Sequence, residues 1–86
     1  MARTTSREAA FLSLDTYFRE GVFIEESLER FKKELSTRDF ALAYEIATGV
    51  VRRKNALDAI AKKQGATPKK RQEKILLRMC LYQLLF

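Results

Sequence analysis

The sequence predicts an all-α fold of about five helices, and two observations lead to that prediction. Only three glycines and one proline interrupt the 86 residues, too few turn formers for a β-protein built from hairpins. Apolar side chains instead recur every three and four residues, which places them on one face of a helix. Apolar residues make up 47% of the chain, a share typical of globular proteins. We therefore expect a single helical domain over residues 1–86.

The first helix is expected over residues 6–20. Thr5 precedes Glu8 by three residues, the spacing of a capping box, which predicts the start of the helix. Gly21 is expected to end it. Five apolar residues share one face of this helix: Ala10, Phe11, Leu14, Tyr17 and Phe18.

The second helix is expected over residues 23–35. Its glutamates come early and its lysines late, an order that complements the helix dipole. Its apolar face carries four residues: Ile24, Leu28, Phe31 and Leu35.

The third helix is expected over residues 37–53, after a cap formed by Ser36 with Asp39. Its apolar stripe has six members: Phe40, Ala43, Tyr44, Ala47, Val50 and Val51. Gly49 lies within this helix, where glycine costs about 1 kcal/mol relative to alanine. Its presence predicts close packing against another helix.

A fourth, shorter helix is expected over residues 55–63, with Asn55 as a cap or kink. Residues 64–68 contain the one proline and form the predicted loop. The fifth helix is expected from residue 69 to the end of the sequence.

The segment from Ile75 to Phe86 is apolar at ten of twelve positions, almost all round the helix. A helix that is apolar on every side is expected to be buried on every side, so Cys80 is expected to be a small buried hydrophobe. Tyr44 and Tyr82 are expected in the core, each with its ring buried and its hydroxyl group in contact with water. The apolar pattern stops at Phe86 without a cap, so we expect a domain incomplete at its C-terminal end, or a helix that packs against another chain.

The net charge of +6 is unevenly distributed. Residues 1–45 carry seven basic and nine acidic side chains, whereas residues 46–86 carry ten basic and two acidic ones. Clustered cations indicate a phosphate-bearing partner, although an ordinary solvated face would also carry them. The candidate RNA-binding residues are Arg3, Arg7, Arg52, Arg53, Lys54, Lys69, Lys70 and Arg71.

This sequence lacks the residues that several classes of protein function require. Without histidine there is no imidazole base or ligand, and one cysteine forms neither an internal disulfide nor a cysteine zinc site. The glycines are too scattered for phosphate-binding loops. No stretch approaches the ~20 apolar residues of a membrane span, and the N-terminus lacks the apolar core of a signal peptide. We expect no catalysis, metal or cofactor in this chain, no membrane partner, and a cytoplasmic location.

Three segments resemble the NusB-like RNA-binding family: 38–53 (RDFALAYEIATGVVRR), 57–58 (LD) and 75–86 (ILLRMCLYQLLF). The family includes the stand-alone antitermination protein NusB. It also includes the N-terminal domain of bacterial ribosomal RNA cytosine-5 methyltransferases of the Sun/RsmB type. The run 49–58 (GVVRRKNALD) looks more like the methyltransferase version, because stand-alone NusB is usually less basic just after this glycine.

The resemblance implies an all-α, NusB-like helical bundle that continues with further helices in the family. It also implies a chain that positions small-subunit ribosomal RNA for a downstream domain that binds S-adenosylmethionine. The family's Arg-rich N-terminal segment is sparser here, with only Arg3 and Arg7. The alternative is a stand-alone antitermination factor that binds RNA and a ribosomal protein, or a second copy through the apolar last helix. A solvated helical domain without a ligand is a third reading.

Overall fold

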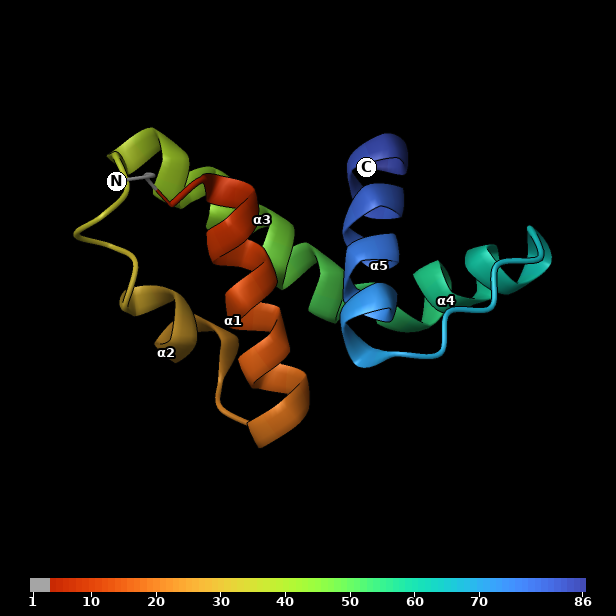
Figure 1. Ribbon diagram of the computed structural model, residues 1–86. Coiled ribbons are helices and arrows are strands. Elements are labelled where there is room, and N and C mark those ends of the chain that lie inside the picture. The colour runs from red at the N-terminus through yellow and green to blue at the C-terminus, as the bar shows by residue number, and fades with distance from the viewer. Residues whose placement is uncertain (1–3) are drawn as a thin grey trace.

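The computed structural model describes residues 4–86, and these fold into five helices with no strand among them (Figure 1). The helices are α1 (Ser6–Glu20), α2 (Ile24–Glu29), α3 (Thr37–Arg52), α4 (Lys54–Lys63) and α5 (Arg71–Leu85). The predicted all-α fold is therefore confirmed, and only the end of α2 departs from the predicted bounds by more than two residues. Within the described range no helix is long and apolar enough to cross a membrane.

Helices α1, α2 and α3 pack together, and α5 packs against α1, α3 and α4 (Figure 1). Helices α1 and α5 lie side by side and run antiparallel. Arg7 near the start of α1 contacts Gln83 near the end of α5, whereas Asp15 further along α1 contacts Arg71 at the start of α5. The last helix therefore ties the N-terminal helices to α4.

A bend at Arg53 separates α3 from α4, because its φ of −110° and ψ of 17° depart from helical values. The prediction of a cap or kink at Asn55 is wrong by two residues, since Asn55 lies in the first turn of α4. Gly49, one turn before the bend, is where α5 approaches α3. A Cβ atom at this position would overlap the ring of Tyr82, so the predicted close packing at Gly49 is confirmed.

Three predicted helix ends are confirmed, two of them by side-chain hydrogen bonds. The hydroxyl of Thr5 accepts from the backbone N–H of Glu8 at 3.0 Å, and that of Ser36 accepts from the N–H of Asp39 at 3.1 Å. Gly21 ends α1 with a φ of 74°, a left-handed conformation that glycine adopts without a steric penalty. Local sequence signals thus set both ends of α1 and the start of α3.

Replacing Ser36 with alanine is expected to lower the free energy of unfolding by about 1 kcal/mol, because the N–H of Asp39 loses its acceptor. The matched control is Thr37→Ala, since Thr37 is exposed and lies inside the first turn, beyond the capping position. Urea denaturation of both variants makes the comparison. Equal losses in the two variants would contradict the capping role of Ser36.

One core receives side chains from all five helices, and Leu14, Leu28, Val50 and Leu57 are fully buried in it. The predicted apolar stripe of α3 is wrong at one position, since Tyr44 is 42% exposed. Tyr82, in contrast, is half-buried against the core as predicted. Helix α3 is contacted by α1 and α2 as well as by α5, so its buried arc includes Ile46, which the stripe left out.

Helix α2 ends at Glu29, earlier than the predicted end at residue 35. The residues that follow form tighter turns, in which the N–H of Phe31 donates to the carbonyl of Leu28 at 2.9 Å. The tighter turn carries Leu35 into the core, where it is 8% exposed. The apolar pattern therefore identified the buried residues correctly but not the backbone conformation that places them in the core.

Helix α5 is not buried on every side, contrary to the prediction. Its buried residues are Ile75, Arg78 and Met79. Cys80 is exposed rather than buried, and Leu76 and Leu84 are 51% and 79% exposed. Helices α1, α3 and α4 cover only part of the circumference of α5, so these three side chains stay exposed within residues 4–86.

Candidate nucleic-acid interface

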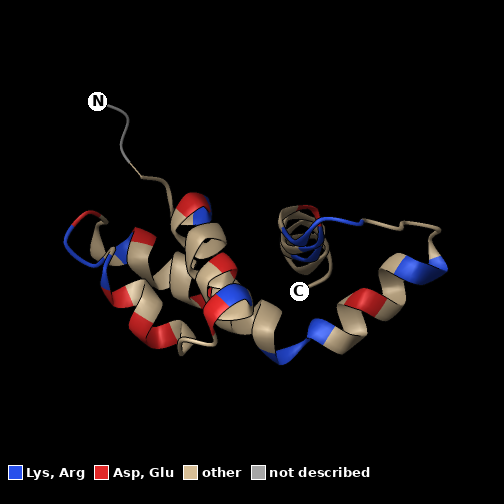
Figure 2. Cartoon of the chain, turned by 60° about the horizontal axis from the view of Figure 1, so that its bottom comes forward, with Lys and Arg blue, Asp and Glu red and all other residues tan. Residues whose placement is uncertain are grey.

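The charges of the molecule are separated in space as well as in sequence (Figure 2). Most carboxylates lie on α1, α2 and the start of α3. The charged side chains of α4, of the loop after it and of the start of α5 are mostly lysine and arginine. A concentration of one sign of charge creates a field that attracts polyanions to that end of the molecule.

Four lysines gather around the loop that joins α4 to α5. Lys62 and Lys74 line one hollow beside loop residues 66–68, and Lys69 and Lys70 line a second hollow beside the same residues. In residues 4–86 none of the four forms an ion pair. We call these four residues the lysine surface. Lys62 and Lys74 were not among the predicted RNA contacts. They lie on either side of the predicted loop in the sequence, and that position could have identified them.

The two carboxylates of residues 46–86 are both engaged. Glu73 accepts a hydrogen bond from the backbone N–H of Lys70 at 3.1 Å, which caps α5. Asp58 accepts two hydrogen bonds from Arg78, at 2.8 and 3.1 Å. Lys54, a predicted RNA contact, lies 3.4 Å from the same carboxylate. Each carboxylate also lines one of the two hollows, where cationic side chains outnumber it, so the lysine surface stays positive in sum.

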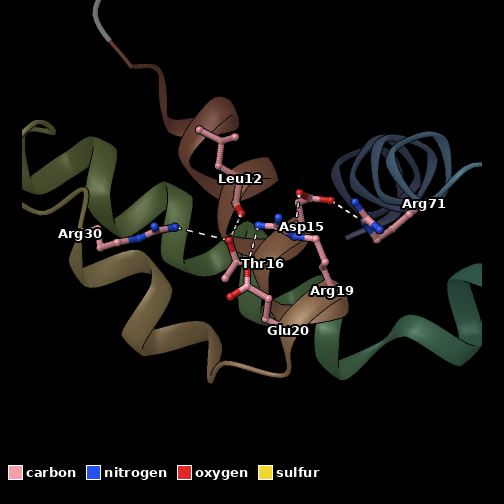
Figure 3. A network of polar contacts seen from close by, with 7 residues as sticks. All are labelled: Leu12, Asp15, Thr16, Arg19, Glu20, Arg30 and Arg71. Atoms are coloured by element: carbon pink, nitrogen blue, oxygen red, sulfur yellow. Dashed lines mark hydrogen bonds and ion pairs between the residues drawn. The ribbon is translucent and has the colours of Figure 1, made fainter.

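Arg71, another predicted RNA contact, joins α5 to α1 through an ion-pair network (Figure 3). Its Nε lies 2.7 Å from Oδ1 of Asp15, whose other oxygen lies 3.9 Å from Nε of Arg19. Arg19 in turn reaches Glu20 at 2.8 Å. Only the remaining N–H groups of Arg71 are available to a further partner.

Two predicted residues meet the last turn of α5. The Nε of Arg7 donates to Oε1 of Gln83 at 3.3 Å. The guanidinium of Arg53 lies 4.2 Å from the centre of the Phe86 ring, which stacks on Tyr82 at 5.7 Å. A stacked guanidinium keeps its N–H donors, which lie in its plane, free for a phosphate. We call Arg7 and Arg53 the arginine site.

The structure separates two basic runs that the sequence grouped together, 52–54 and 69–71. Arg53 lies at the last turn of α5, whereas Arg71 begins that helix. The helix between them has 15 residues, a length of about 22 Å. The chain thus offers two cationic sites rather than one. The remaining candidate, Arg3, lies outside the described residues.

Arg52 does not share a site with Arg53, although the two are adjacent in sequence. It lines a hollow between α2 and α3, together with Glu25 and Tyr44. The two arginines therefore serve different sides of α3.

A comparison with known protein families matches residues 4–86 to the NusB family. No curated protein and no solved structure matches the chain.

Proposed function

The chain belongs to the NusB family, an RNA-binding family, and from that premise we propose that the lysine surface is its principal RNA contact. The supporting observation is that four lysines, none of which forms an ion pair within residues 4–86, converge around loop residues 66–68. Ammonium groups bind phosphates as point charges, and such contacts supply much of the affinity for RNA without reading its sequence.

The arginine site is the second proposed contact. Guanidinium groups bind phosphates through two parallel hydrogen bonds, which fix orientation as well as adding affinity. Arg53 is held against the ring of Phe86, so its position is partly set before RNA binds. A strand that reached both sites would follow the length of α5.

We further propose that the RNA is small-subunit ribosomal RNA and that the chain is the N-terminal domain of a bacterial cytosine-5 methyltransferase of the Sun/RsmB type. The basic run 49–58 supports this choice over stand-alone NusB. In this proposal the chain is not itself an enzyme. It seats the RNA in the cytoplasm for a downstream domain that binds S-adenosylmethionine.

The second candidate function is that of a stand-alone antitermination factor, which binds a ribosomal protein as well as RNA. The observation that favours it is the exposed apolar surface of α5, where Leu76 and Leu84 are 51% and 79% exposed. Such a face suits a protein contact, with a ribosomal protein or a second copy of this chain. Binding of a ribosomal protein to the isolated chain would favour this candidate.

Reversing two cations of either site is expected to weaken RNA binding. Each double variant, K69E/K70E and R7E/R53E, should lower affinity for a ribosomal RNA fragment by at least about tenfold. The plot of log affinity against log salt should also become shallower by about 1.4 for two lost contacts to single-stranded RNA. Fluorescence anisotropy at several salt concentrations measures both quantities.

The matched control is K32E/K33E, which makes the same change in net charge after α2. Lys32 lies 3.6 Å from Glu29 on the exposed surface, a pair of little energetic value. This variant should keep most of the affinity. If all three double variants lose affinity equally, the loss reflects net charge and the two sites are wrongly assigned.

A further inference from the structure

Helices α2 and α3 border a hollow of about 240 Å³ on the opposite side of α3 from Arg53. The volume falls below the roughly 300 Å³ at the lower end of pockets for drug-sized ligands, so it suits a single flat ring system. Its lining comes from both helices: Ile24, Glu25, Tyr44, Thr48, Val51 and Arg52.

The hollow combines an aromatic face with two opposite charges. Tyr44, Thr48 and Arg52 follow one another at four-residue spacing, so they form one ridge of α3. The Tyr44 residue is 42% exposed. Glu25 comes from α2, and within the part of the chain that the structure describes neither it nor Arg52 forms an ion pair. A carboxylate and a guanidinium are thus both open to one ligand.

We infer that this hollow holds an unpaired guanine base of the bound RNA, an inference that rests on the proposed function. Guanine offers two adjacent N–H donors, at N1 and N2, to a carboxylate such as that of Glu25. It also offers two acceptors, O6 and N7, to a guanidinium such as that of Arg52. Adenine, cytosine and uracil lack one pair or the other. The ring of Tyr44 supplies a stacking surface, the usual way in which proteins hold unpaired bases.

The charge around the hollow favours a base over a phosphate. Glu25, Glu26 and Glu29 are exposed on α2 and repel the RNA backbone. The backbone is therefore kept at the edge of the hollow, and only the uncharged base reaches Glu25. This arrangement makes the carboxylate of Glu25 favourable for guanine and unfavourable for RNA in general.

The test uses the two opposite effects expected of Glu25, which should favour guanine and disfavour RNA without it. Two labelled oligouridylates, one with a central guanosine and one with a central adenosine, are titrated with the wild-type chain and with Glu25→Gln. The substitution should weaken binding of the guanosine oligonucleotide about tenfold, since a bidentate pair is lost. Binding of the adenosine oligonucleotide should stay equal or become tighter, because a repelling charge is removed.

The matched control is Glu26→Gln, which removes the neighbouring exposed carboxylate outside the hollow. It should leave both affinities equal or raised. A second variant, Tyr44→Ala, should weaken guanosine binding about tenfold through lost stacking, with its helical circular dichroism unchanged.

Three outcomes would overturn the guanine site. The first is that Glu25→Gln behaves like Glu26→Gln. The second is that the wild-type chain binds both oligonucleotides equally, which removes the guanine site but leaves RNA binding intact. The third is that neither oligonucleotide binds, in which case the proposed function fails with it.

Discussion

Replacing Asp58 with asparagine is expected to lower the free energy of unfolding by about 2–3 kcal/mol. The Arg78 side chain is only 10% exposed, and it donates to Asp58 at 2.8 and 3.1 Å while its guanidinium lies 5.0 Å from the Phe18 ring. Asparagine would leave that buried charge without a counter-ion. The loss is below the roughly 3–5 kcal/mol of a fully buried pair because Asp58 itself is 42% exposed.

Two further variants make this result specific. Replacing both partners, in D58N/R78M, should recover most of the lost stability, because no unpaired charge is then buried. Asp39→Asn, an exposed aspartate in the first turn of α3, should change stability by less than about 1 kcal/mol. Urea denaturation measures all three. A loss at Asp58 no larger than that at Asp39 would contradict the role of the buried pair.

The same pair predicts a dependence on pH. The hydrogen bond from Arg78 holds the pKa of Asp58 below its ordinary value of 3.8. Partial burial raises this pKa, whereas the positive charges of Arg78 and Lys54 lower it further. Because the folded pKa is the lower one, the stabilisation is complete above about pH 4 and is lost as the pH falls through the folded pKa. The D58N variant should therefore lose less stability than the wild type on acidification from about pH 5 to pH 2. Parallel losses would contradict this.

Replacing Gly49 with alanine is expected to destabilise the domain by up to about 2 kcal/mol, although alanine normally strengthens a helix. The added Cβ would overlap the ring of Tyr82, which is half-buried and stacked on Phe86. The ring must move, at a cost of about 1–3 kcal/mol that exceeds the helix-propensity gain of about 1 kcal/mol.

The sign of the Gly49 effect should reverse once the ring is absent. In a Tyr82→Ala background the obstruction is gone, so Gly49→Ala should stabilise the domain by about 1 kcal/mol. The four proteins form a double-mutant cycle, measured by chemical denaturation. If Gly49→Ala has the same sign in both backgrounds, the contact between α3 and α5 does not explain the glycine.

Local features of the sequence predicted the helices well, because their causes are local. The caps at Thr5 and Ser36 and the stop at Gly21 depend on residues within one turn. The end of α2 was predicted wrongly because it depends on where Leu35 must go to reach the core. The apolar run of α5 was also misread, since periodicity records which residues are apolar but not how many neighbours surround them.

The sequence also located the positive charge in the second half of the chain, since charge can be counted without a structure. It could not say which cations have partners. Arg71 is paired with Asp15 and Lys54 with Asp58, whereas Lys62 and Lys74 lie beside the predicted loop and form no ion pair in the described part of the chain.

By itself, then, the sequence determined the helices, the family resemblance and the half of the chain that attracts anions. Only the tertiary structure decided that Arg53 and Arg71 lie at opposite ends of α5 and that Arg52 and Glu25 line one hollow between α2 and α3. The reason is physical. Helix formation and net charge depend on residues close in sequence, whereas ion pairing and the shape of a hollow depend on helices that meet only after the chain has folded.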